Sequence, residues 1–326
     1  MRIDPAIAEW RRDGAAQRSA QRDLESARQT WRDGAARSLL ADLDRYGAGE
    51  KLGCCDELQS ALRCPTTADA LLAPLLSALV DSQRRHPLGQ VPFRHHYSHG
   101  SGLVQLAASG RATVSLVFYE AESSKDQAGT IAFADGKRHE LCLAGAASGH
   151  LFALEKQADG AARIASEPLD LRRGVALKLG GDRTKRLERI AGRLVILRLA
   201  REAVYPRPSH EYRIADGALI HRASGDREES RKEIAIALLA RMGRQDAAPV
   251  LARITRSSRS DHLRWQALRA ALALDTACGF AQLAAIAEDR GDALREPARL
   301  LRDHLLASHP QLAKLEPRSD PGLCPA

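Results

Sequence analysis

The sequence lacks the features that mark secreted and membrane-spanning proteins. No uninterrupted apolar run approaches the roughly 20 residues that a helix needs to cross a bilayer. The first residues, Met-Arg-Ile-Asp-Pro, carry an acid and a proline where a signal peptide would place an apolar stretch. We therefore expect a soluble, cytoplasmic protein with no membrane partner.

The cysteines show no pattern of a disulfide framework or a zinc site. No Cys-x-x-Cys pair is present, and the adjacent Cys54 and Cys55 are poorly placed to bond each other or to share a tetrahedral metal ion. At 326 residues, the chain is long enough for two or three domains with cores of their own. Disulfides are therefore unnecessary, and we expect reduced thiols at positions 54, 55, 64, 142, 278 and 324.

Motifs of common catalytic sites are also missing. The sequence has no Gly-x-Ser-x-Gly nucleophile elbow and no P-loop. Aromatic residues make up only 4% of the chain, and none stands between Arg172 and Arg201, where cations are densest. A platform for single-stranded nucleic acid would interleave the two residue types. No catalytic activity is predicted, and whether the chain is an enzyme stays open.

The positive charge is concentrated in one stretch. Residues 171–207 hold eleven cations and three acids, an excess that equals the net charge of +8 of the whole chain. A local positive field attracts phosphates, nucleic acid or an acidic protein surface, although solvated strand faces would give the same pattern. Gly180-Gly181 forms either a hairpin with a charged tip or a turn that offers amides to an anion. The anion-binding candidates are Arg183, Lys185, Arg186, Arg189 and Arg193.

Apolar periodicity divides the chain into three regions and a tail. Over residues 1–88, Leu24, Trp31 and Leu39 recur at helical spacing. Over 89–224, short alternating runs are separated by turn signals, which is typical of antiparallel sandwiches. Helices return over 225–316, and 317–326 is predicted to be a flexible tail. We predict a multidomain α+β protein with an antiparallel β-sandwich at its centre.

The order of many short strands and hairpin turns over residues 89–224 resembles a cupin-type jelly roll. That resemblance implies a metal-dependent enzyme or sensor that holds one divalent ion, such as Fe, Zn or Mn. The chain departs from the ligand pattern of that family, because no His-x-His pair occurs in it.

Histidines gather at the start of the β region. In an extended chain, His95 and His99 point to one side and His96 to the other, so the first two converge on one point. A further ligand would have to come from a neighbouring strand. Histidines in a strand-edge loop are more often surface residues, so we expect either no cofactor or one divalent metal ion. The candidate ligands are His95, His96, His99, Glu120 and His150.

A duplication marks the C-terminal region, where residues 239–254 return 32 residues later as 271–286 and Leu251 aligns with Leu283. Paired amphipathic helices at a fixed period predict a solenoid, and a helical bundle is the alternative. The phrase around Trp265 resembles the first helix of a HEAT-like repeat, which implies a surface that docks a protein partner. Trp265 itself either fills the core between repeats or anchors that interface. The interface candidates are Trp265, Arg264 and Arg269.

Three functional hypotheses follow. The leading one is a non-catalytic binding or regulatory protein that acts through its HEAT-like repeats and its basic β surface, because a duplication is present and catalytic spacing is absent. The alternatives are a metal-dependent, cupin-like enzyme or sensor and a nucleic-acid-binding protein.

Overall fold

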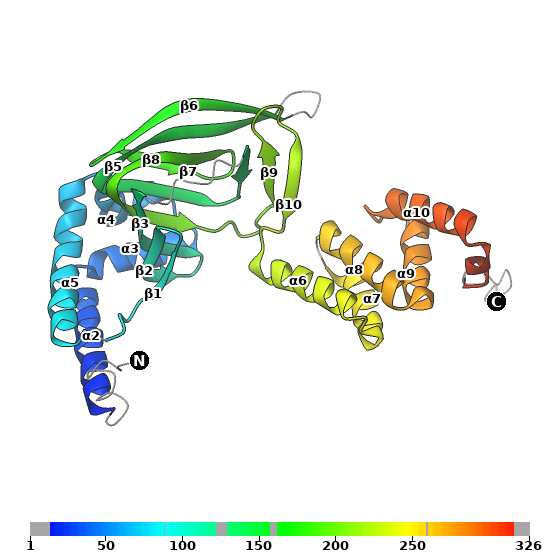
Figure 1. The fold of residues 1–326 in the computed structure, drawn as a ribbon, viewed down its shortest axis with the longest axis horizontal. Coiled ribbons are helices and arrows are strands. Elements are labelled where there is room, and N and C mark those ends of the chain that lie inside the picture. The colour runs from blue at the N-terminus through cyan, green and yellow to red at the C-terminus, as the bar shows by residue number, and fades with distance from the viewer. Residues whose placement is uncertain (1–13, 88, 122–128, 157–161, 259, 316–326) are drawn as a thin grey trace, which may run out of the picture. The chain divides into compact units, whose positions relative to one another are not determined.

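The computed structural model describes residues 14–87, 89–121, 129–156, 162–258 and 260–315 (Figure 1). The chain divides into two compact units, Met1–Ala223 and Ser224–Ala326. The first unit combines helices with two antiparallel sheets, and the described part of the second contains helices alone. The predicted α+β class with a β-sandwich centre is confirmed.

The N-terminal helices pack around Trp31, which is 3% exposed. Leu24 and Trp31 lie on one face of α2, and the indole N–H of Trp31 donates to the Leu71 carbonyl oxygen of α5 at 2.9 Å. Gly34 ends α2, and Pro65 begins α5, where a missing amide is tolerated. The described elements are α2 (Ala15–Asp33), α3 (Arg37–Ala48), η1 (Leu52–Cys54), α4 (Asp56–Ala61) and α5 (Pro65–Arg85).

Two antiparallel sheets follow these helices. The larger has the strand order β1-β2-β3-β8-β5-β6, with β7 paired to β5, and the smaller has the order β10-β9-β4. The apolar runs of residues 140–143 and 151–154 are both parts of the single long strand β5. The strands are β1 (Arg94–Ser98), β2 (Ser101–Ser109), β3 (Ala112–Glu120), β4 (Thr130–Phe133), β5 (Lys137–Lys156), β6 (Ala162–Arg172), β7 (Ala176–Leu179), β8 (Arg183–Arg201), β9 (Ser209–Arg213) and β10 (Leu219–Ala223).

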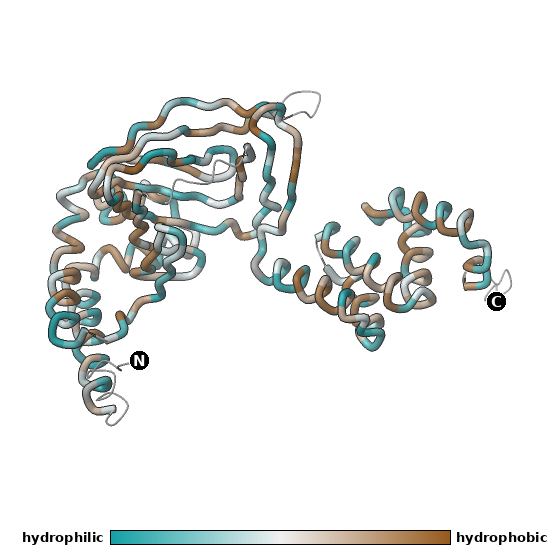
Figure 2. Tube along the Cα trace, viewed as in Figure 1, coloured by the Kyte–Doolittle hydropathy of each residue, from teal (hydrophilic) through white to brown (hydrophobic). Residues whose placement is uncertain are grey.

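The two faces of the larger sheet have different partners. Leu197 and Leu199 of β8 pack against α3 and α5 in one core, to which the helices contribute Leu43 and Leu75. Residues of the opposite parity, such as Ile196, face a second core on the other side of the sheet. The smaller sheet shares a third apolar cluster with β5 and β6. Apolar segments recur along both the helices and the strands (Figure 2). The N-terminal helices are thus one layer of the β-containing unit.

In the second unit, α8 packs against α6, α7 and α9, and α9 packs against α10. Leu251 and Leu283, which the duplication aligns, are 1% and 0% exposed. Met242 is 58% exposed, whereas its counterpart Leu274 is 8% exposed. Helix α8 contacts α6, α7 and α9, which explains that difference. The elements are α6 (Arg227–Arg241), η3 (Gln245–Ala247), α7 (Ala248–Ser257), α8 (Asp261–Leu274), α9 (Thr276–Glu288), α10 (Arg295–Ser308) and η4 (Pro310–Leu315).

The paired helices agree with the expected duplication, and a HEAT-like assignment stays a prediction. Asp226 is the N-cap of α6, and its carboxylate accepts from the amides of Glu228 and Glu229. Among the described residues, no helix is both long and apolar enough to cross a membrane.

Candidate anion-binding pocket

A charge cluster is buried on the sheet face that points away from the helices. Glu140 of β5 is 2% exposed and accepts from Lys185 and, at 2.7 Å, from Arg198 Nε, both of β8. Burial opposes the charge of Glu140, but the two cations together outweigh it and lower the pKa of Glu140 below its ordinary value. Lys185 and Arg198 therefore both pair with an internal carboxylate.

Other cations of the basic stretch also pair with groups of the same unit. Arg183 pairs with Glu167 at 3.1 Å. Arg193 pairs with Glu120 at 2.8 Å. Arg186 donates to a backbone carbonyl and lies over the Phe152 ring. Of the five anion-binding candidates, only Arg189 is exposed without a described partner. The candidates are divided among separate contacts and do not form one anion-binding surface, because successive residues of β8 face opposite sides of the sheet.

A different set of cations surrounds a pocket of 630 Å³ at the edge of the larger sheet. The pocket lies where β5, β7 and β8 meet the β2–β3 turn and the loop after α3. Five cations and three acids line it together with small and apolar residues. The lining residues are Gly49, Arg111, Asp135, Gly136, Lys137, Lys178, Leu179, Gly180, Gly181, Asp182, Arg183, Arg201, Glu202, Ala203 and Val204.

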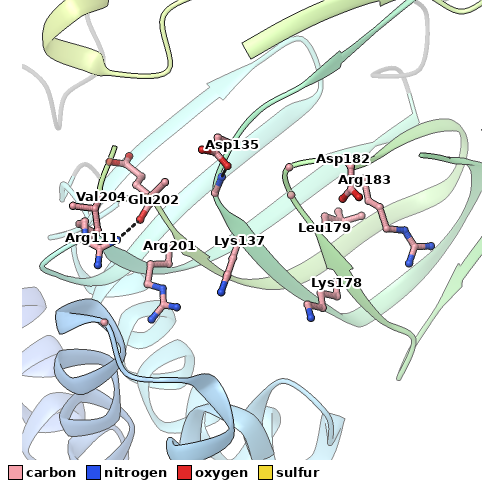
Figure 3. A pocket seen from close by; sticks show the side chains of 15 residues that line it. Arg111, Asp135, Lys137, Lys178, Leu179, Asp182, Arg183, Arg201, Glu202 and Val204 are labelled. Carbon is pink, nitrogen blue, oxygen red and sulfur yellow. Dashed lines mark hydrogen bonds between the residues drawn. The ribbon is translucent and has the colours of Figure 1, made fainter. Parts of the chain in front are cut away.

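Three of these cations point to the same side of the sheet. Figure 3 shows Lys137, Lys178 and Arg201 extending toward the helical layer, whereas Asp135 lies away from them. The strand register explains this, because Lys137 of β5 is directly opposite Arg201 of β8, and Lys178 of β7 is opposite His139 of β5. All four residues therefore share one sheet face at neighbouring positions.

The positive charge of this group has no internal carboxylate to balance it. Lys137 and Lys178 are exposed, and neither forms an ion pair with a described acid. Arg201 donates to the carbonyl oxygens of Tyr46 and Glu50 at 2.8 and 2.6 Å and stacks on the Tyr46 ring, so its charge is not neutralised. Of the acids in the lining, Asp135 is bound by Arg207.

The pKa of His139 depends on its burial and on these positive charges. Burial is the largest cause that lowers the pKa of His139 below its ordinary value, and the charges of Lys178, Lys137 and Arg201 lower it further. The imidazole is therefore mainly neutral at pH 7. An anion that enters the pocket would oppose the same field and raise the pKa of His139.

The glycine turn beside the pocket does not offer free amides. The Gly180 amide donates to the Arg183 carbonyl at 2.9 Å, and the Gly181 amide donates to the Ala134 carbonyl at 3.0 Å. Gly180-Gly181 is thus a hairpin turn between β7 and β8, and side chains must supply the contacts to an anion.

In the described contacts, the metal-ligand candidates bind other residues and not one another. His95 Nδ1 donates to the Phe93 carbonyl at 2.9 Å, and His150 Nδ1 lies 2.9 Å from Glu188 Oε1. Glu120 accepts from Tyr97 and Arg193. His96 is exposed on β1, and His99 is in the turn after that strand. In the part of the chain that the structure describes, no three His, Cys, Asp or Glu side chains are grouped for a metal ion.

The interface candidates differ in their surroundings. Trp265 is half-buried and packs against the core that contains Leu268. Arg264 pairs with Asp261 and Asp292, and its side chain is 13% exposed. These ion pairs join Arg264 to its own helical unit. Arg269 is exposed on α8.

Sequence reasoning did not single out Lys137 and Arg111, which line the pocket, or His139, which shares a sheet face with Lys137. These residues come from the β2–β3 turn and the start of β5, outside the dense basic stretch. Lys178 and Arg201 belong to that stretch but not to the candidates drawn from it. Only the pairing of β5 with β7 and β8 brings the group together, and no local motif encodes that pairing.

Comparison with known proteins finds similar structures for part of the chain. No protein-family model and no curated protein sequence matches the chain. Solved structures match part of it. A vicilin from Capsicum annuum is 17% identical over 37% of this chain and 32% of its own, with a TM-score of 0.25. An oxalate decarboxylase is 17% identical over 37% of this chain and 33% of its own, with a TM-score of 0.25.

A capsular polysaccharide assembling protein from Staphylococcus aureus is 13% identical over 45% of this chain and 42% of its own, with a TM-score of 0.25. The chain thus spans about a third of the vicilin and the decarboxylase, which are cupin-fold proteins. Likeness at this level carries no activity or ligand over to this chain.

Proposed function

We propose that this protein is a non-catalytic binding or regulatory protein whose β domain takes up a small oxyanion with two or more negative charges. The observation that supports this most strongly is the convergence of Lys137, Lys178 and Arg201 on one pocket, where none of the three forms an ion pair with a described acid. Unbalanced cations in a concave site raise the local concentration of anions.

The chemistry of the three side chains favours a compact, multiply charged ligand. Lys137 and Lys178 each present a flexible ammonium group, which binds phosphate or carboxylate oxygens as a point charge. Arg201 already uses donors on backbone carbonyls, so it contributes mainly charge. Phosphate, pyrophosphate and citrate match this arrangement. Because both lysines are exposed to water, we expect modest affinity that weakens with salt.

His139 makes the proposed site sensitive to pH. Binding an anion raises the pKa of His139, so binding takes up protons and becomes tighter as the pH falls from 7 toward the pKa of the free protein. Below that pKa the dependence levels off. This coupling supports a regulatory role, since a change in pH alters occupancy without any catalytic step.

The helical unit completes the proposal. Stacked helix pairs expose long surfaces that suit macromolecular contacts, and we infer that this unit docks a protein partner in the HEAT-like manner. The cations between residues 171 and 207 are mostly paired within the β-containing unit. That pairing favours a small anion over a nucleic-acid strand.

Thermal unfolding of the full chain with a panel of anions tests the anion-binding proposal. At equal ionic strength, pyrophosphate and citrate are expected to raise Tm more than acetate, because ligands that bind only the folded state stabilise it. The difference is expected to depend on pH between pH 7.5 and pH 6, and His139→Gln is expected to shift this dependence by the contribution of the imidazole. Equal Tm values in all three anions would contradict the proposal.

A titration with labelled single-stranded DNA separates this proposal from the nucleic-acid hypothesis. We expect the DNA to bind weakly, and we expect pyrophosphate not to increase the affinity for DNA. Tight binding that falls steeply with salt would favour the nucleic-acid hypothesis, because each phosphate contact releases counterions.

A further inference from the structure

The second unit has an apolar groove that its own helices leave unfilled. The groove has a volume of 510 Å³ and lies between the α8–α9 junction on one side and α10 with η4 on the other. Cavities of roughly 300–1,000 Å³ are typical of ligand sites. The space is therefore large enough to receive side chains from another molecule.

Leucine side chains form the floor of the groove. Leu301 and Leu305 stand four residues apart on one face of α10, and Leu272 of α8 lies opposite them. All three are only half-buried, although they pack at the margin of a core that includes Leu312. A partner that covers them would remove apolar surface from water, which is favourable in proportion to the area covered.

The rim of the groove is basic. Arg269 is exposed and forms no ion pair with a described acid, and His309, directly before η4, also lines the groove. None of the described lining residues is an aspartate or a glutamate. The groove is thus complementary to a partner with aliphatic side chains and a negative charge.

We propose that this groove binds a peptide segment of a partner protein, placing one or two aliphatic side chains against Leu272, Leu301 and Leu305 and a carboxylate against Arg269. Amphipathic segments enter hydrophobic grooves in this way, with anchors spaced three or four residues apart. A guanidinium–carboxylate contact fixes the orientation of the segment. The proposal rests on the docking role of the helical unit, and it names the chemistry of the partner.

Selection from a random 12-residue peptide library displayed on phage, with the full chain as the target, tests this inference. Enriched peptides are expected to share two aliphatic residues three or four positions apart and at least one acidic residue. The dissociation constant of a synthetic enriched peptide is then measured by fluorescence polarisation for the parent chain and for the variants described next.

Arg269→Glu is expected to weaken peptide binding about tenfold or more, because it replaces the cation that pairs with the peptide carboxylate by a like charge that repels it. Arg299→Glu is the matched control, since Arg299 is also exposed but does not line the groove. It is expected to leave binding within about twofold of the parent. Ala273→Glu, at an exposed lining position, is expected to block the groove without removing a core side chain.

Equal binding by Arg269→Glu and Arg299→Glu would overturn the inference. Recovery of no specific peptide, or of peptides without acidic and aliphatic residues, would also overturn it. Binding of decanoate that is lost in Arg269→Glu, with no peptide binding, would assign the groove to a small amphipathic acid instead. Pyrophosphate binding by the β domain is expected to be unchanged in Arg269→Glu, so this inference and the anion proposal fail separately.

Discussion

Gly145 of β5 lies against the backbone of Arg193 of β8 so closely that a Cβ atom at Gly145 would stand 2.1 Å from the Arg193 carbonyl oxygen. Gly145 has a φ of 82°, in the region that side chains other than hydrogen rarely adopt. The pairing register shifts on both sides of this position. The two strands therefore approach closely at a β-bulge in the long β5–β8 ladder. The same ladder includes the pair Lys137 and Arg201.

We predict that Gly145→Ala destabilises the protein by more than about 2 kcal/mol, because the left-handed backbone costs roughly 1–2 kcal/mol and the clash with Arg193 adds to it. Gly192→Ala is the control, since Gly192 has a φ of 73° but no atom within 4 Å of the added Cβ. It is expected to lose only about 1–2 kcal/mol. Urea unfolding measures both, and equal losses would contradict the close packing at the bulge.

The buried carboxylate of Glu140 gives a second prediction. Glu140→Gln leaves Lys185 and Arg198 buried without a balancing charge, so we expect a loss of about 3–5 kcal/mol in the free energy of unfolding at pH 7. Lys185→Met keeps the Glu140–Arg198 pair and is expected to cost less. A Glu140→Gln variant as stable as the parent would contradict the internal role of this cluster.

The pH dependence of the same pair has a defined sign. The pKa of Glu140 is lower in the folded protein than in the unfolded chain. Its contribution is therefore fully present above the unfolded carboxyl pKa of about 4.3 and is lost as the pH falls toward the folded value. Unfolding measured from pH 7 to pH 3 should show the stabilities of the parent and of Glu140→Gln converging. A constant difference down to pH 3 would contradict it.

Cys64 is predicted to be the most reactive thiol among the described cysteines. Hydrogen bonding from the Thr66 side chain is the largest of the causes that lower the pKa of Cys64 to about 6. Burial raises the pKa of Cys55 and of Cys142. Alkylation by iodoacetamide at the Cys64 peptide, followed by mass spectrometry, is expected to reach half its maximal rate near pH 6.

Thr66→Ala is expected to move that midpoint upward, because it removes the strongest stabilisation of the thiolate. A rate that rises only above pH 8 in the parent chain would show that the Cys64 thiol is not perturbed.

The metal hypothesis has its own measurement, which is elemental mass spectrometry of protein purified without chelator or affinity histidines. We expect His95→Ala/His99→Ala to have the same metal content and Tm as the parent, because these histidines are in separate contacts in the described chain. About one Fe, Zn or Mn per chain that is lost in the double variant would favour the cupin-like enzyme or sensor instead.

Local sequence signals predicted part of the secondary structure. Helix α9 occupies Thr276–Glu288, within the region 225–316 where helices are predicted. Strand β6 was not predicted, because Pro168 and several charged residues interrupt its apolar alternation. β6 is at the edge of the larger sheet, where a proline is tolerated and one side is free of a partner strand.

The candidate site could not be predicted from local sequence signals, because residues far apart in the sequence form its contacts. Glu140 and Lys185 are 45 residues apart in sequence, and nothing near either residue specifies the other. A dense basic stretch predicts a positive field, but the alternation of β8 sends Lys185 and Arg198 into the interior. The pocket cations Lys137 and Lys178 come from two strands whose register is set by long-range pairing.

Titration calorimetry of pyrophosphate into the full chain tests the central claim most directly. Lys137→Ala/Lys178→Ala removes the two exposed cations of the pocket, and Arg172→Ala/Arg189→Ala removes two exposed cations of the same unit that do not line it. Both variants change the net charge equally. The account predicts that the first loses about tenfold or more in affinity, a factor worth about 1.4 kcal/mol, while the second stays within about twofold of the parent. Equal affinities for the two variants would show that pyrophosphate responds to net charge alone, and the proposed pocket would be wrong.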